Sequence, residues 1–244
     1  MLYKANKGQV SYGEAIGILM LDTYTPFIPG DVGNASTYDF PVRYETVEDL
    51  TVKRIFSKDK SAYDKLKEAA ERLESQGVKA ITGDCGFMAI YQQQLVKDLN
   101  IPVFLSSMLQ VPFISNIIGN DKKVGIISAN SKSLNDNKLL KEVGIESSTP
   151  IIIEGLEEKN EFNKSIIEEV GVLDPDKIEK EVVMSAKDMV KTEGDIGAIL
   201  LECSVLPPYS KAVQKATQLP VFDYITMINY VYSSIIQKKY SGIY

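Results

Sequence analysis

The chain has 244 residues, of which 44% are hydrophobic and 25% are charged, and its formal net charge is −6. This length supports one large domain or two of about 120 residues each. The acidic balance, with lysines scattered among acids, gives no basic surface for nucleic acid. No apolar run reaches the ~18 residues of a membrane span, and residues 1–11 hold no signal-peptide core. We therefore expect a cytoplasmic protein without nucleic-acid or membrane partners.

The sequence contains no histidine and only two cysteines, Cys85 and Cys203. Without histidine there can be no Ser-His-Asp triad, Cys-His dyad or histidine-based zinc site. The sequence has no CxxC pair, which would indicate a structural zinc. It also has no GxGxxG or GxxxxGK[ST] motif, which would indicate a nucleotide site. We therefore expect neither a metal nor a cofactor, and acid–base chemistry would fall to Cys, Asp, Glu, Lys or Tyr.

Short apolar, β-branched runs alternate with longer amphipathic stretches along the chain. The runs predict strands at residues 15–21, 50–55, 78–82, 103–105, 123–128, 150–153, 196–201 and 221–222. The stretches predict helices at residues 59–76, 88–99, 108–118, 131–143, 174–192, 207–217 and 224–239. Runs that are apolar on both faces are typical of parallel strands covered by helices. The alternation thus predicts an α/β fold with mainly parallel sheets.

The two cysteines occupy matched positions in an internal repeat. Each follows an apolar run, and each stands 17 residues before a proline, Pro102 or Pro220. We therefore predict two similar, pseudo-symmetric α/β halves, 1–118 plus 223–244 and 119–222. The active site is expected in the cleft between them, with one thiol on each wall. The long irregular segment at 22–45 is either a functional loop or a packed Ω-loop.

Each thiol is expected where a strand ends and a helix begins. Backbone N–H groups at such a position favour the reactive thiolate, whereas the neighbouring Asp84 and Glu202 disfavour it. Two facing thiols can act as base and acid on opposite faces of one carbon, which inverts a stereocentre. The alternatives are two buried, inert cysteines or a redox pair.

Other polar side chains are candidates for substrate binding. Hydroxyl groups cluster at the same predicted sheet edge, on Thr23, Ser106, Ser107, Ser128 and Ser204. Helix capping alone would also explain them. Arg43 is the best-placed cation for a substrate carboxylate, unless it forms a surface ion pair with Glu45 or Asp39. Tyrosines at 224–244 suit either core packing or a dimer contact, so a homodimer remains open.

The residues around the two cysteines resemble a known family. Cys85, and Cys203 within LECS followed by Pro207, look like the aspartate/glutamate racemase superfamily. The segments PGDVGN at 29–34 and GDCGF at 83–87 look like an uncharacterised branch of that family. The resemblance covers essentially the whole chain.

The resemblance implies roles for particular residues. Cys85 and Cys203 would be the opposed acid and base, without pyridoxal phosphate or metal. Asp22 and Thr23 resemble the Asp-Ser pair that follows the first strand of glutamate racemases.

The sequence also departs from the pattern of glutamate racemases. Gly86 and Phe87 replace Asn-Thr after the first cysteine, Ser204 replaces a common Thr, and Val205 stands in place of a histidine. Gly86, Phe87, Val205 and the 22–45 loop are expected to select the substrate.

The function expected from the resemblance is that of an isomerase. It would racemise or epimerise a small carboxylic acid, such as aspartate or glutamate, by two-base proton transfer. The alternatives are a decarboxylase or cis–trans isomerase on the same fold, and a small-molecule-binding protein that has lost catalysis.

Overall fold

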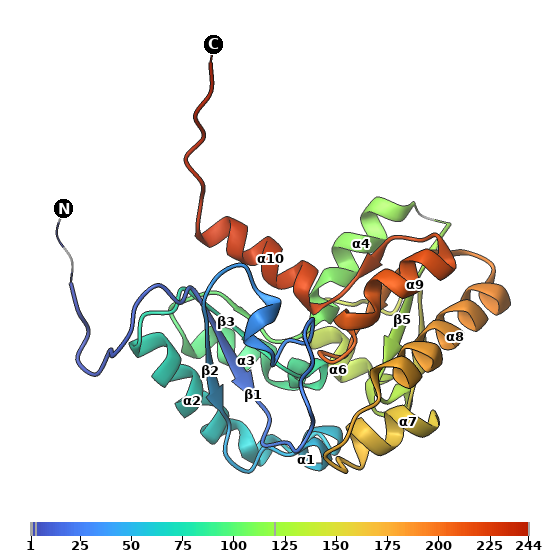
Figure 1. Ribbon diagram of the computed structural model, residues 1–244, viewed down its shortest axis with the longest axis horizontal. Coiled ribbons are helices and arrows are strands. Elements are labelled where there is room, and N and C mark those ends of the chain that lie inside the picture. The colour runs from blue at the N-terminus through green and yellow to red at the C-terminus, as the bar shows by residue number, and fades with distance from the viewer. Residues whose placement is uncertain (1, 3, 120, 244) are drawn as a thin grey trace.

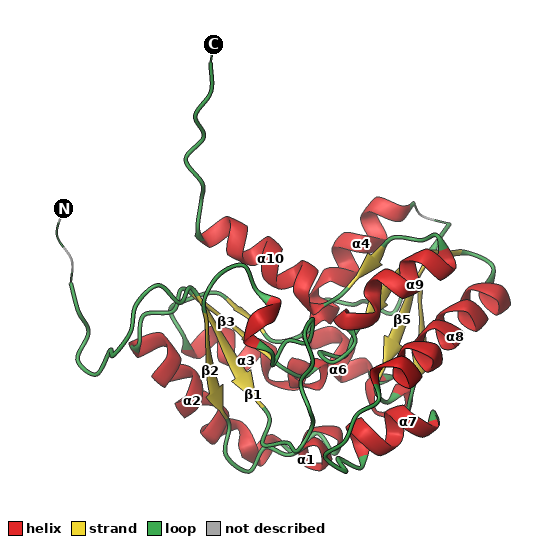
Figure 2. Ribbon diagram, viewed as in Figure 1, coloured by secondary structure: helices red, strands yellow, loops and turns green. Residues whose placement is uncertain are grey.

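The computed structural model describes residues 2, 4–119 and 121–243. Two four-stranded sheets, each entirely parallel, are surrounded by helices, which confirms the predicted α/β fold (Figures 1 and 2). Residues 1, 3, 120 and 244, which fall in or between the predicted halves, lie outside the described residues. Within the described ranges, no helix is both long enough and apolar enough to cross a lipid bilayer.

The two sheets repeat one topology. The first has the order β2-β1-β3-β4, with strands at Val42–Thr46, Ile16–Met20, Ala80–Gly83 and Val103–Phe104. The second has the order β6-β5-β7-β8, with strands at Ile151–Gly155, Lys123–Ser128, Ile196–Leu201 and Val221–Phe222. The register repeats as well, because Ile81 pairs with Val103 just as Ile199 pairs with Val221.

Helices surround both sheets. The α-helices are α1 (Val52–Phe56), α2 (Tyr63–Ser75), α3 (Gln92–Asp98), α4 (Val111–Ile118), α5 (Ser131–Leu134), α6 (Asn137–Glu142), α7 (Asn160–Phe162), α8 (Pro175–Glu193), α9 (Ser210–Thr217) and α10 (Tyr224–Ile235). Short 3-10 helices lie at Ala35–Thr37, Lys60–Ala62, Gly86–Tyr91, Ser107–Gln110 and Pro207–Tyr209, and a π-helix at Asn163–Ile167.

Local sequence signals explain where the longest helix begins and ends. The Asp174 side chain accepts a hydrogen bond from the backbone N–H of Lys177, and Pro175 occupies the first turn, where its missing N–H is not needed. Gly194 ends α8 with a φ of 70°, a left-handed conformation that suits glycine. The apolar stripe of α8, which includes Ile178 and Val182, packs in one core cluster with Leu201 of β7.

The hydrophobic core is continuous between the two halves. One cluster joins Leu19 and Ile81 of the first sheet to Ile126 and Leu200 of the second. On the other face of the first sheet, α10 packs through Tyr224, Met227 and Ile228 against Ile16 and Ile18. The last helix of the chain thus returns to the first sheet (Figure 1).

Two predicted elements are wrong. Residues 50–55 were expected to form a strand, but residues 52–56 form α1, because the Thr51 side chain accepts from the backbone N–H of Arg54 and caps a helix. The edge strand β2 lies instead at the end of the predicted loop, where it pairs with β1. The predicted helix at 131–143 is divided into α5 and α6, because Asp136 caps a new helix.

Candidate active site

A small cavity of about 40 Å³ lies where the central strands of both sheets end. Its lining comprises Leu21, Thr23, Thr25, Phe27, Val52, Phe56, Asp84, Cys85, Gly86, Phe87, Ala129, Ile166, Glu202, Cys203, Ser204 and Val205. Segments that follow β1, β3, β5 and β7 all contribute to it. Carboxyl ends of parallel strands are the usual ligand-binding edge of α/β sheets. The repeat therefore places matching residues of the two halves around one cavity.

Both cysteines line this cavity as free thiols. Burial raises the pKa of Cys85 well above its ordinary value, and negative charge on Cys203, Asp84 or Glu202 raises it further. The pKa of Cys203 is also raised, by burial first and then by Glu202. The backbone N–H groups of Phe87 and Val205 act in the opposite direction at the two thiols. Because charge on one thiol opposes charge on the other, the pair favours at most one thiolate.

The acids that precede the cysteines are buried beside them. The Asp84 carboxylate accepts a hydrogen bond from the backbone N–H of Leu21 at 3.0 Å, and Oε2 of Glu202 accepts one from the Ser128 hydroxyl at 2.9 Å. Burial raises the pKa of each carboxyl to about 7, against the effect of these hydrogen bonds. Both groups can therefore change charge near neutral pH.

Glu202 reaches from the second half to the first. A Cβ atom at Gly86 would lie only 1.5 Å from Oε1 of Glu202, so position 86 must lack a side chain for this carboxyl to fit. Other contacts cross the same boundary: the Ser107 hydroxyl donates to the backbone carbonyl of Glu202 at 3.0 Å. The Ser204 hydroxyl donates in turn to the backbone carbonyl of Asp84. Each half thus helps to hold the acid of the other.

A contact between the two halves also involves the cavity-lining residue Thr23. Glu169, which follows the π-helix, accepts a hydrogen bond from the Thr23 hydroxyl and another from the backbone N–H of Tyr24 at 3.0 Å. Thr23 also shares a hydrogen bond of 3.0 Å with Thr25, which lines the cavity with it. The segment after β1 is therefore tied to the second half.

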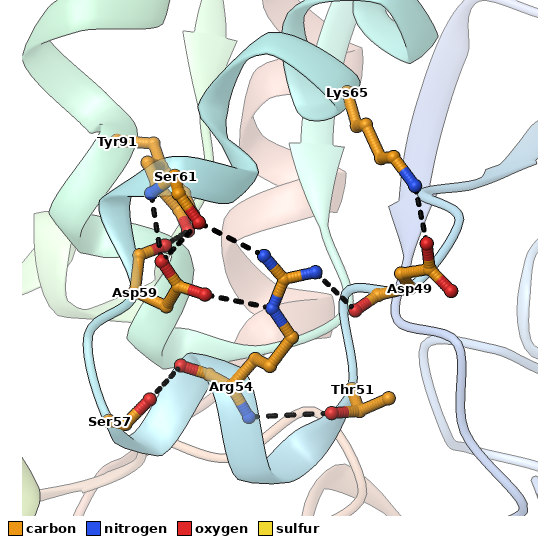
Figure 3. Close-up of polar contacts among 8 residues, drawn as sticks. All are labelled: Asp49, Thr51, Arg54, Ser57, Asp59, Ser61, Lys65 and Tyr91. Carbon is orange, nitrogen blue, oxygen red and sulfur yellow. Dashed lines mark hydrogen bonds and ion pairs between the residues drawn. The ribbon is translucent and has the colours of Figure 1, made fainter.

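Helix α1 supplies an apolar wall through Val52 and Phe56. The ring of Phe56 packs edge-on against that of Phe87, with centroids 4.8 Å apart. Figure 3 shows how Arg54 fixes this short helix: it donates to Asp59 at 2.8 Å and to the backbone carbonyl of Asp49 at 3.0 Å.

The structure brings together about half of the predicted site residues. Those that line the cavity are Cys85, Cys203, Thr23, Gly86, Phe87 and Ser204. Ser107 and Ser128 do not line the cavity, but each donates a hydrogen bond to Glu202, which does.

Three predicted binding residues are placed elsewhere. Ser106 caps a 3-10 helix by accepting from the backbone N–H of Met108. Asp22 is exposed, and its carboxylate accepts from the backbone N–H of Asp49. Arg43 lies on β2, where it pairs with Glu14 at 3.2 Å, so it is not available at the cavity.

Several lining residues were not predicted. Val52 and Phe56 lie on the helix that was mistaken for a strand, and Ile166 lies in a π-helix with no recognisable signal. Phe27 lies within the irregular 22–45 segment, whose length after a strand end was the one signal that could have indicated it.

Comparison with solved structures defines the fold class. Unliganded arylmalonate decarboxylase aligns over 91% of this chain and 92% of its own, with a TM-score of 0.61 and 14% identity. A glutamate racemase from Bacillus anthracis aligns over 92% of this chain and 82% of its own, with a TM-score of 0.56 and 16% identity. The chain therefore shares the fold of a decarboxylase and of a racemase, as the predicted resemblance implied.

Sequence comparison defines the family within this class. The chain is 33% identical over 235 residues to a dimethylsulfoniopropionate lyase from Durusdinium sp. clade D. This alignment covers 94% of the chain and 77% of the relative. Dimethylsulfoniopropionate lyase 3 from Emiliania huxleyi is also 33% identical, but the chain spans only 62% of its length. The chain belongs to the dimethylsulfoniopropionate lyase family. No protein-family model matches it.

These relatives correct the functional prediction. Amino-acid racemisation, and with it the isomerase class, is wrong because the curated relatives across 94% of the chain are named lyases. The comparisons favour the alternative of another reaction on the same fold. The shared fold misled the prediction, since it hosts both racemases and a decarboxylase.

Proposed function

We propose that this chain cleaves dimethylsulfoniopropionate, the compound for which its relatives are named. One observation supports the proposal: this chain belongs to that family, and its two buried thiols, Cys85 and Cys203, line one cavity at the ends of β3 and β7. Thiols can act as bases once they ionise.

The substrate's own structure suggests the reaction. Its sulfonium group is attached to the carbon next to the one that bears the carboxylate. When a base removes a proton from the carbon beside the carboxylate, the released electron pair forms a carbon–carbon double bond. The carbon–sulfur bond breaks and its electrons leave with sulfur, giving neutral dimethyl sulfide and acrylate. The proton stays on the base until water takes it.

We assign Cys203 as the base and Cys85 as the thiol that remains protonated. The coupling between them allows only one thiolate at a time, because a charge on either thiol raises the pKa of the other, and the variants below test which thiol carries it. A bound sulfonium ion would favour the thiolate, since a nearby positive charge lowers a thiol pKa. The leaving group departs as a neutral molecule and needs no proton. Elimination therefore requires one base, whereas racemisation requires two proton-exchanging groups.

Serine substitutions at the two cysteines test this assignment. We expect Cys203→Ser to lower kcat for acrylate formation by about 100-fold or more, the usual contribution of a positioned base. Cys85→Ser should lower it by about tenfold or less, because this thiol only shapes and polarises the cavity. Initial rates of acrylate release would be measured at saturating substrate. A Cys203→Ser variant that folds and stays within about threefold of the parent contradicts the assignment.

A further inference from the structure

We propose that the cavity contains a subsite for a methylated onium group, and that Glu202 is the residue that selects for its positive charge. The inference rests on the proposed function for the identity of the substrate and extends it to the groups that recognise that substrate.

The first argument is the charge balance of the cavity. Its described lining contains two acids, Asp84 and Glu202, and no lysine or arginine. A third buried acid, Asp31, lies close enough to Cys203 to raise its pKa. Buried carboxylates are normally paired with a cation or a metal. A ligand that carries its own positive charge would supply the partner that the protein does not.

The second argument is an unpaired oxygen. Oε2 of Glu202 accepts from Ser128, but Oε1 is buried and has no hydrogen-bond partner among the described residues. Leaving a buried acceptor unsatisfied is costly, so this arrangement calls for a functional explanation. The carboxylate need not touch the cation, because Coulomb attraction over a few ångströms remains strong where water is excluded.

The rest of the lining indicates what kind of cation would fit. The aromatic residues Phe27, Phe56 and Phe87 form part of the wall, together with Val52 and Ile166. Aromatic faces attract onium ions, whose methyl groups need no hydrogen-bond acceptors. A metal ion is a poorer match, because the described residues do not assemble three potential ligands at any one point.

Two ligands of equal shape would separate charge from fit. Trimethylammoniopropanoate carries an onium charge, and its carbon isostere has a tert-butyl group in place of the trimethylammonium group. Their binding to the full chain would be measured by calorimetry at pH 8, above the pKa of about 7 of Glu202. We expect the charged ligand to bind at least about tenfold more tightly than the isostere.

Variants assign this preference to a residue. Glu202→Gln keeps the side-chain volume and should reduce the preference to less than about threefold. Glu161→Gln is the matched control, because Glu161 is also buried but pairs with Lys177 away from the cavity lining, and it should keep the parental ratio. Asp84→Asn, which retains the acceptor for Leu21, should reduce the ratio less than Glu202→Gln does.

Equal binding of the two ligands to the parent chain overturns the subsite, even if no variant folds. An unchanged ratio in folded Glu202→Gln, or a larger loss in Asp84→Asn, overturns the role of Glu202. Because binding is measured without turnover, a chain that prefers the cation but forms no acrylate would refute the proposed lyase reaction alone. A chain that forms acrylate without charge preference would refute only the subsite.

Discussion

At the scale of single residues, the site is defined by buried ionisable groups. Glu202 and Asp84 each have a pKa near 7 because burial disfavours their charged forms. Burial also raises the pKa of Asp31 well above its ordinary value. The chain has no histidine, and ordinary carboxyls titrate near pH 4. Titration between about pH 5.5 and pH 8 is therefore dominated by Glu202 and Asp84.

This arrangement predicts that the free energy of unfolding falls as the pH rises from about 5.5 to 8. In this window the folded chain keeps protons that the unfolded chain has lost, so stability must decrease with pH. Glu202 and Asp84 should each contribute a decrease on the order of 2 kcal/mol. Urea unfolding at a series of pH values would measure it, and Glu202→Gln should lessen the slope. A stability that is flat or rises over this window contradicts the raised pKa values of these two buried carboxyl groups.

At the scale of elements, the sequence predicted the strands of the two sheets with one exception, the edge strand β2. The runs 123–128 and 196–201 were predicted correctly because a short, continuous apolar run is typical of a parallel strand that helices cover on both faces. β2 is a half-buried edge strand within a segment rich in proline and glycine, and its pattern carried no such signal. Helix α1 was mistaken for a strand because Val52 and Ile55 are β-branched.

Only the part of the site that the internal repeat contains, the two cysteines, could be predicted from the sequence. Cys85 and Cys203 stand at matched positions, so strand topology alone brought them to one edge. The contact of Glu202 with Gly86, and the place of Phe56 in the wall, depend on how the two halves pack. No local pattern encodes that packing.

Helix α1 offers a test at this scale. Arg54→Ala removes hydrogen bonds to Asp59, Asp49 and Ser61 and should lower the free energy of unfolding by about 1–2 kcal/mol. Because α1 carries Phe56, the KM for dimethylsulfoniopropionate should rise several-fold more than kcat falls. Lys132→Ala, which breaks only an exposed pair with Glu158, is the control. An Arg54→Ala variant with parental KM would show that the α1 wall does not bind substrate.

At the scale of the whole molecule, two similar halves enclose one cavity and are tied across it. The first half contributes Thr23 and Tyr24, the second contributes Glu169, and Glu202 of the second half lies against Gly86 of the first. Such a cavity can exist only while the halves stay closed, because neither half alone provides all its walls.

Glu169→Ala tests whether this contact keeps the cavity closed. The substitution removes the acceptor for Thr23 and Tyr24 but leaves the core clusters intact. We expect KM to rise about threefold to tenfold, as for the loss of one or two partly exposed hydrogen bonds, with the unfolding midpoint little changed. Glu158→Ala, which affects an exposed acid of the same half, should leave KM unchanged. Equal KM values in the two variants would contradict a closing role for Glu169.

We propose that this chain, on a racemase-like fold, eliminates dimethyl sulfide by removing a proton beside a carboxylate. The most direct measurement incubates the purified chain with dimethylsulfoniopropionate and follows dimethyl sulfide and acrylate together. We expect equimolar formation of the two products, at a rate that falls when deuterium replaces hydrogen on the carbon beside the carboxylate. Substrate that is returned unchanged by a folded chain, or dimethyl sulfide released without acrylate, would contradict it.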